Sequence, residues 1–203
     1  MEFYELHPIN PEIRYINKAI KVLKEGGVII YPTDTVYGIG CDIFNKQALD
    51  RVKEIKINPD IKLLSFICSD LKDISRYAKV SDYAYKTMRH LLPGPYTFIL
   101  PAAKLVPKKL WSKRKTVGIR IPDHKVALKI VEGMGNPIIS TSATTRKGEL
   151  LINPLEIKSV FEFQVDLMLA SGNLSGKPSS VIDLSDEEPI IVREGAGDTS
   201  IFA

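Results

Sequence analysis

The sequence contains little of what usually marks a disulfide framework or a metal site. It has two cysteines and three histidines in 203 residues. Cys41 and Cys68 lie far apart and belong to no Cys-x-x-Cys pair, so we expect both to be reduced packing residues. The histidines are isolated and lack the spacings that bring two imidazoles onto one metal ion. We therefore expect no dedicated metal site in the protein.

The sequence also lacks the long apolar runs of membrane proteins. No run approaches the roughly 18 to 20 residues that span a bilayer. The opening MEFYELHPINPE has no basic segment followed by an apolar one, as a signal peptide would. At 44% hydrophobic and 26% charged residues the chain is typical of a globular protein, and no repeat or low-complexity linker divides it. We expect one cytoplasmic domain over residues 1–203.

The formal charge of +4 is mild, but one stretch concentrates positive charge without any acidic residue. A mild excess favours anionic partners only where it is gathered in one place. Three interpretations are open: a solvated loop, a flap that gathers phosphates, or a contact with RNA, for which Lys113, Arg114 and Lys115 are the candidates. The stretch comprises Lys104, Lys108, Lys109, Lys113, Arg114 and Lys115.

Helical periodicity begins near the amino terminus. Asn10 can cap a helix and Pro11 suits its first turn, and Gly26 stops the pattern. The apolar residues that recur at helical spacing between them are Ile13, Ile16, Ile20 and Leu23. The pattern predicts a helix that packs on a sheet.

Helical and strand-like segments alternate along the rest of the chain. Helices are expected at 46–55, 81–92, 124–132 and 154–161, and short apolar strands at 63–68, 97–100, 116–121 and 137–140. Three further runs, at 165–170, 180–184 and 190–193, follow with little helix between them, which favours antiparallel additions. The sequence therefore predicts an α/β fold with a mixed sheet.

The segment GGVIIYPTDTVYGIG at residues 26–40 combines a buried strand with a hydroxyl-rich turn. The apolar run at 28–31 reads as a strand, which Pro32 ends. Thr33, Asp34 and Thr35 follow at its carboxyl end, where short polar side chains either bond the turn backbone or face a ligand. Both interpretations fit the local pattern.

Several segments together resemble the YrdC/YciO family. They occur in the family's order and cover nearly the whole chain. They are YPTDTVYGIGCDIFNKQALDRVKEIK from residue 31, PGPYTFILPA at 93–102, TVGIRIP at 116–122, PIISTSA at 137–143, SSVIDL at 179–184 and VREGAGD at 192–198. The resemblance implies a twisted, open α/β sheet with helices on its faces and a large basic cavity.

The resemblance also implies a reaction. Known members make threonylcarbamoyl-AMP from L-threonine, bicarbonate and ATP, release pyrophosphate, and thereby serve the t6A modification of tRNA. No protein nucleophile is needed, so we assign no catalytic residue and expect positioning and electrostatics to act instead. Mg²⁺ would enter with the nucleotide.

Individual site residues follow from the matching motifs. On the amino-acid side the resemblance implies Thr35, Arg120, Ser140 and Ser179, with the Arg120 guanidinium meeting the substrate carboxylate. On the nucleotide side it implies Lys56, Lys62, Thr116, Ser142 and Arg193. The loop at 172–178 is either a cover over this site or a plain connection.

Two departures from the family pattern bear on activity. Asn58 stands where relatives carry an arginine that holds phosphate, and Thr144 stands where they carry an asparagine. With these departures, the chain resembles the YciO branch of the family. Three functions follow as hypotheses: a synthase with weakened activity, a double-stranded RNA or tRNA-binding paralogue without it, and an adenylate-forming or nucleotide-binding enzyme for another amine.

Overall fold

The computed structural model describes residues 1–55, 64–107, 110 and 114–202. Within these residues the strands, in chain order, are β1 (Glu2–Glu5), β2 (Ile29–Tyr31), β3 (Gly38–Asp42), β4 (Ser65–Ile67), β5 (Tyr96–Pro101), β6 (Thr116–Arg120), β7 (Ile138–Ser142), β8 (Leu167–Ala170), β9 (Ser180–Asp183) and β10 (Ile190–Arg193). The helices are α1 (Ile13–Lys24), α2 (Lys46–Ile55), α3 (Ile74–Tyr77), α4 (Asp82–Leu91), α5 (Lys125–Met134) and α6 (Pro154–Phe161), and a 3₁₀ turn η3 (Ser200–Phe202) lies near the carboxyl end.

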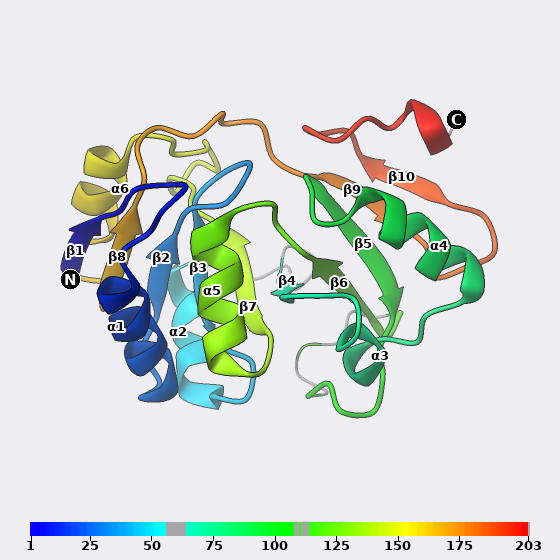
Figure 1. Cartoon of the computed structure of the whole chain (residues 1–203), viewed down its shortest axis with the longest axis horizontal. Coiled ribbons are helices and arrows are strands. Elements are labelled where there is room, and N and C mark those ends of the chain that lie inside the picture. Colours follow the sequence, from blue (N-terminus) through cyan, green and yellow to red (C-terminus); the bar gives the residue numbers. More distant parts are fainter. Residues whose placement is uncertain (56–63, 108–109, 111–113, 203) are drawn as a thin grey trace.

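These strands form one mixed sheet in the order β1-β8-β2-β3-β7-β4-β6-β5-β9-β10 (Figure 1). The predicted α/β fold with a mixed sheet is confirmed. Strands β1 and β3 were not expected, because β1 carries a glutamate at each end and two glycines interrupt the apolar pattern of β3.

The expectation that the last three strands add in antiparallel fashion is wrong for two of them. Strand β8 inserts between β1 and β2 and runs parallel to both. The chain then crosses the molecule from β8 to β9 (Figure 1), so that β9 lies parallel to β5. Only β10, which follows β9 after a short connection, pairs antiparallel. The partners of β8 and β9 lie far away in the sequence, so the local pattern could not indicate the direction of pairing.

Four helices agree with the sequence pattern. Helices α2 and α6 have the predicted bounds, and α4 and α5 differ by one or two residues at their ends. Capping explains the difference at the start of each helix: the Ser81 hydroxyl accepts the Ala84 N–H at 3.2 Å, and the His124 ring accepts the Val126 N–H at 3.3 Å. Each polar side chain satisfies a first-turn N–H and sets where its helix begins.

The predicted start of the first helix is wrong. Helix α1 begins at Ile13 after Glu12, and Asn10 does not cap it. The His7 Nδ1 atom accepts the N–H groups of Ile9 at 3.2 Å and Asn10 at 3.1 Å, so this segment closes its own turn before the helix. A local side-chain bond of this kind competes with helix formation.

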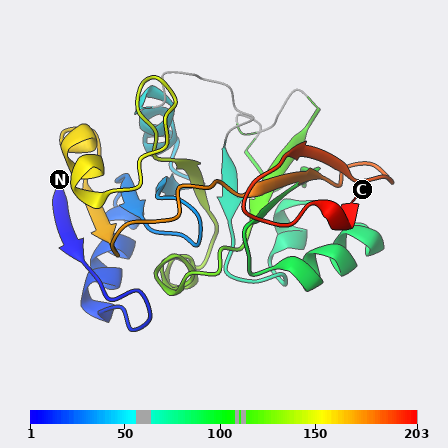
Figure 2. The same cartoon turned by 90° about the horizontal axis from the view of Figure 1, so that it is seen from above.

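The helices bury apolar residues on both sides of the sheet. Helices α1 and α5 lie on one side and α2 and α6 on the other (Figure 2). One buried cluster joins α1 and α5 to β2, β7 and β8, through residues such as Ile16, Ile130 and Leu167. The second extends along the whole sheet and includes residues of α2, α3, α4 and α6.

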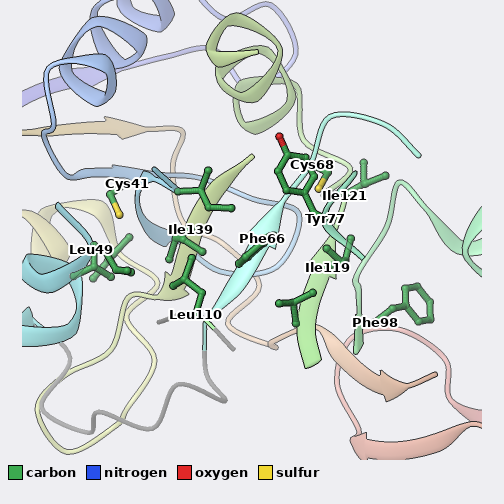
Figure 3. Packing of buried hydrophobic residues seen from close by; sticks show 14 of the residues in the cluster. Cys41, Leu49, Phe66, Cys68, Tyr77, Phe98, Leu110, Ile119, Ile121 and Ile139 are labelled. Atoms are coloured by element: carbon green, nitrogen blue, oxygen red, sulfur yellow. The ribbon is translucent and has the colours of Figure 1, made fainter. Parts of the chain in front are cut away.

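Phe66 on β4 shows how this second cluster continues from one strand to the next. It pairs with Ile139 of β7 on one side and with Ile119 of β6 on the other, and Figure 3 shows the three side chains together. Cys41 and Cys68 lie in the same cluster, and both are buried free thiols, as expected. Burial raises the pKa of each thiol to about 12.

Candidate functional site

A cavity of about 1060 Å³ lies against the central strands. Strand register explains its position. Ser65 of β4 pairs with Gly118 of β6 and with Ser140 of β7, and paired residues face the same side of a sheet. All three line the cavity. Because these residues are small, they leave open the space that larger side chains would fill.

The turn after Pro32 forms one wall of the cavity, and its two threonine hydroxyls have different roles. Thr33 lines the cavity, and its Oγ1 donates to the Val36 carbonyl at 2.6 Å while accepting the N–H groups of Thr35 and Val36 at 3.2 Å. Thr35 is fully buried behind this wall, and its Oγ1 accepts from Arg120 at 2.8 Å. The Thr33 hydroxyl therefore stabilises the turn backbone, whereas the Thr35 hydroxyl connects the turn to Arg120.

Arg120 is a buried cation on the cavity wall, with 6% of its surface exposed. Its Nη2 atom donates to Asp34 Oδ1 at 2.5 Å and to Thr35. Arg120 Nε and Asp34 Oδ2 are also buried, yet neither has a hydrogen-bond partner among the described residues. These two unsatisfied atoms are costly to bury. Arg120 itself lines the cavity, where a guanidinium suits an anionic group.

Ser140 is oriented by a buried tyrosine. The Tyr31 hydroxyl donates to Ser140 Oγ at 2.7 Å. Burial raises the pKa of Tyr31, and the bond to Ser140 only partly opposes this, so the phenol stays protonated and donates. A methyl group on Gly38 would lie 2.8 Å from Ser140 Oγ, which explains why glycine fits there. The Ser140 hydroxyl is thus held against the cavity.

Ser179 and Arg193 meet on the same cavity. Arg193 donates to the Ser179 carbonyl from Nε at 3.1 Å and from Nη2 at 2.8 Å, and Nη2 also contacts Ser179 Oγ at 3.2 Å. Thr97 Oγ1 lies 2.9 Å from that hydroxyl. Burial, and then the positive charge of Arg120, lower the pKa of Arg193, so the two guanidinium groups act on one shared space. Arg193 nevertheless remains charged, because arginine is not deprotonated in proteins.

Of the other residues expected on the nucleotide side, two lie on the cavity wall. Thr116 and Ser142 line the same cavity, as does Thr144, the departure from the family pattern. Lys56, Lys62 and Asn58 lie outside the described residues.

The two described RNA-binding candidates, Arg114 and Lys115, differ in their surroundings. Arg114 lines the cavity and forms ion pairs with Asp183 at 3.1 Å and Asp186 at 2.8 Å. Lys115 is exposed and does not line it, and Lys113 lies outside the described residues. Two carboxylates thus balance the charge of Arg114, which the sequence pattern of the basic stretch did not indicate.

The loop between β8 and β9 closes one side of the site. The Ser175 hydroxyl donates to the Thr35 carbonyl at 3.0 Å, and the Tyr37 hydroxyl donates to the Gly172 carbonyl at 2.6 Å. Pro178 and Ser179, at its end, line the cavity. The loop is more than a plain connection, because it is bonded to the turn that carries Thr35.

Sequence reasoning missed several residues of the site. Asp34 fits the pattern of a turn residue, and its partner Arg120 lies 86 positions away in the sequence, so no local signal indicates the pair. Tyr31, Thr97 and Asp183 read as strand residues, and their contacts depend on strand register. Arg146 also lines the cavity and gave no signal, because it falls in a polar segment between elements.

No described helix has the length and apolar character needed to cross a membrane. Among the described residues there is also no group of three or more histidine, cysteine, aspartate or glutamate side chains that could hold a metal ion. The arrangement that remains is a cavity lined by one buried arginine, by exposed arginines and by hydroxyl groups, which suits anionic organic ligands.

Comparison with known proteins identifies the family to which this fold belongs. The family model for Sua5, YciO and YrdC proteins, which carries the description "Telomere recombination", matches residues 21–195, and the chain belongs to this family. It is 43% identical to YciO of Escherichia coli K12 over 203 residues, covering 99% of this chain and 98% of YciO. The crystal structure of E. coli YciO superposes with a TM-score of 0.96 and full coverage of both chains.

More distant members carry functional names. A threonylcarbamoyl-AMP synthase of Chromobacterium violaceum is 33% identical over 178 residues, covering 87% of this chain and 92% of the synthase. The structure of P. abyssi Sua5 complexed with L-threonine has a TM-score of 0.90 at 27% identity, and the match covers 96% of this chain and 58% of Sua5. The predicted family and fold class are confirmed.

Proposed function

We propose that the protein is a threonylcarbamoyl-AMP synthase-like nucleotidyltransferase. It would convert L-threonine, bicarbonate and ATP into L-threonylcarbamoyl-AMP, pyrophosphate and water, and the product would serve tRNA modification. One observation carries the proposal: Arg120, Ser140, Ser179 and Arg193, which come from four distant segments, line one cavity. A planar cation such as the Arg120 guanidinium suits a carboxylate.

The amino-acid end of the cavity would hold threonine. Arg120 binds its carboxylate, and the hydroxyls of Ser140 and Ser179 bind its polar groups. Tyr31 and Arg193 fix these hydroxyls by hydrogen bonds, so little side-chain freedom is lost when substrate binds. The Sua5 relative solved with L-threonine supports this choice of amino acid.

The nucleotide would occupy the remaining space. Ligand cavities of about 300 to 1,000 Å³ hold drug-sized molecules, and a volume of about 1060 Å³ accommodates ATP beside a small amino acid. Thr116, Ser142 and Arg193 would contact the nucleotide, together with Lys56 and Lys62. Mg²⁺ would arrive with the triphosphate, since hard cations of this kind are bound largely through substrate phosphates.

The chemistry then requires positioning and charge. The threonine amine combines with bicarbonate to give a carbamate and water. A carbamate oxygen attacks the α-phosphorus, and the bond to the β-phosphate oxygen breaks to release pyrophosphate. Arginine side chains stabilise the negative charge that accumulates, and exclusion of water protects the unstable carbamate and adenylate.

The direct test is product formation by the purified chain. Incubation with ATP, bicarbonate and L-threonine should release pyrophosphate and yield the adenylate, which mass spectrometry identifies. Arg193→Gln should reduce the rate about tenfold or more, because a charge-assisted hydrogen bond is lost. Arg89→Gln is the matched control, since Arg89 is exposed on α4 and does not line the cavity.

Three outcomes would contradict the proposal: absence of the adenylate from the wild-type reaction, equal rates for Arg193→Gln and Arg89→Gln, or faster pyrophosphate release with other amines than with threonine. The last result would favour an adenylate-forming enzyme for a different amine.

A further inference from the structure

The segment after β7 forms a short hairpin over residues 144–150. Thr144 and Leu150 form an antiparallel bridge, and the Thr145 N–H donates to the Glu149 carbonyl at 2.8 Å. Thr145 Oγ1 accepts the N–H groups of Lys147 and Glu149, each at 3.2 Å. The hairpin is therefore built by its own hydrogen bonds and projects from the end of β7 (Figure 2).

The tip of this hairpin carries two cations that differ in placement. Arg146 is exposed and lines the cavity, whereas Lys147 is exposed and does not. Because the hairpin continues β7 directly, Arg146 follows Ser140 and Ser142, which line the same cavity. An exposed residue that also lines a cavity lies where the cavity opens to solvent.

Within the described part of the chain, the other charged groups of the cavity leave Arg146 without an acceptor. Among the described lining residues, Arg114 is paired with carboxylates, Arg120 with Asp34, and Arg193 with the Ser179 carbonyl. Asp183, the acidic residue on the described part of the wall, already accepts from Arg114. No described residue accepts a hydrogen bond from the Arg146 guanidinium, so its donors are available to a ligand.

We propose that Arg146 forms a polyphosphate subsite at the opening of the cavity, where it binds the β- and γ-phosphates of the nucleotide or inorganic pyrophosphate. The proposal rests on the proposed function for the identity of the nucleotide. A guanidinium offers paired donors that match phosphate oxygens. The buried Arg120 is held by Asp34 and suits one carboxylate, whereas an exposed, unpaired arginine suits a group of higher charge that stays near solvent.

Binding measurements on the full chain test this subsite apart from turnover. Isothermal titration calorimetry with Mg²⁺ would compare ATP, inorganic pyrophosphate and AMP. Arg146→Gln should weaken ATP and pyrophosphate about tenfold, because one charge-assisted contact is lost. AMP lacks the β- and γ-phosphates, and its affinity should change less than about twofold. Arg146→Lys should restore part of the loss, since it keeps the charge without the fork.

Lys147→Gln is the matched control, since it removes the same charge from the same hairpin but not from the cavity wall. It should alter pyrophosphate affinity less than about twofold, as expected for a solvated charge. Equal losses for Lys147→Gln and Arg146→Gln would overturn the proposal, as would equal losses for AMP and ATP. A wild-type protein that does not bind pyrophosphate would overturn it too.

The outcomes separate this subsite from the proposed reaction. A wild-type protein that binds ATP and pyrophosphate through Arg146 but forms no adenylate supports the subsite and contradicts the synthase. A protein that forms the adenylate at an unchanged ATP affinity after Arg146→Gln supports the synthase and contradicts the subsite.

Discussion

Arg120 and Asp34 define the chemistry of the site at the scale of single residues. Their side chains are 7% and 12% exposed, so the ion pair forms largely out of water. Removal of two charges from water costs several kcal/mol per ion, which a buried pair only partly recovers. The unpaired Arg120 Nε and Asp34 Oδ2 add to this cost. Such an arrangement is a weak source of stability and fits better with a role in binding.

We predict that Asp34→Ala destabilises the protein strongly. The change leaves the Arg120 guanidinium buried, with Thr35 as its one remaining acceptor among the described residues. Loss of one partner of a buried pair lowers the free energy of unfolding by about 3 to 5 kcal/mol. Urea unfolding followed by circular dichroism measures it. In the control Glu25→Ala, the pair with Lys21 is exposed and should be worth less than about 1 kcal/mol. Similar losses in both variants would contradict the prediction.

We predict that the two buried thiols make the stability of the protein depend on pH. Burial, more than the nearby carboxylates, raises the pKa of Cys41 and Cys68 to about 12, whereas an unfolded thiol titrates near about 8.5. At pH 8 the native thiols stay protonated, so neither should react with a disulfide reagent until urea unfolds the chain. Between these pKa values only the unfolded state loses protons. The free energy of unfolding should therefore fall as pH rises above about 8.5.

Thiol titration at pH 8 with and without urea checks the first part. The variant carrying Cys41→Ala and Cys68→Ala checks the second, because its stability should fall less between neutral and alkaline pH. Stoichiometric labelling of the native wild-type protein would contradict the assignment of both thiols to the core.

At the scale of elements, the sequence predicted those helices whose ends carry a capping side chain. Helix α6 begins after Asn153, whose Oδ1 accepts the N–H groups of Leu155 at 2.8 Å and Glu156 at 3.3 Å. Helix α1 has no side-chain cap, and its predicted start was wrong by two residues. Local capping signals can be read from sequence, whereas the turn that His7 closes before α1 competes with the Asn-Pro signal.

We predict that two asparagine substitutions differ in effect for this reason. Asn153→Ala removes the cap of α6 and should lower the free energy of unfolding by about 1 kcal/mol. Asn10→Ala lies outside α1 and should change it by less than about 0.5 kcal/mol. Chemical denaturation of both variants measures the difference. A larger loss for Asn10→Ala would show that this residue does stabilise the helix.

At the scale of the whole molecule, the sequence could name site residues but not their neighbours. Ser140, Ser179 and Arg193 came from motif resemblance, and the sheet order brings their strands to one cavity. The partners of these residues depend on register: Thr97 meets Ser179 because β5 runs parallel to β9, a pairing that local pattern did not indicate. Long-range pairing is set by the packing of the entire sheet, so no single segment encodes it.

We predict that ligand binding in the cavity stabilises the whole fold. The cavity is lined by residues of the neighbouring strands β3, β7, β4, β6, β5, β9 and β10, so a ligand there contacts distant parts of the sheet at once. A ligand that binds only the native state adds about 2.7 kcal/mol at a hundred times its dissociation constant. Thermal unfolding should therefore shift upward with L-threonine and with ATP and Mg²⁺. Arg193→Gln should reduce the ATP shift, and Arg89→Gln should leave it unchanged. Unfolding midpoints that do not move with either substrate at millimolar concentration would contradict a shared binding cavity.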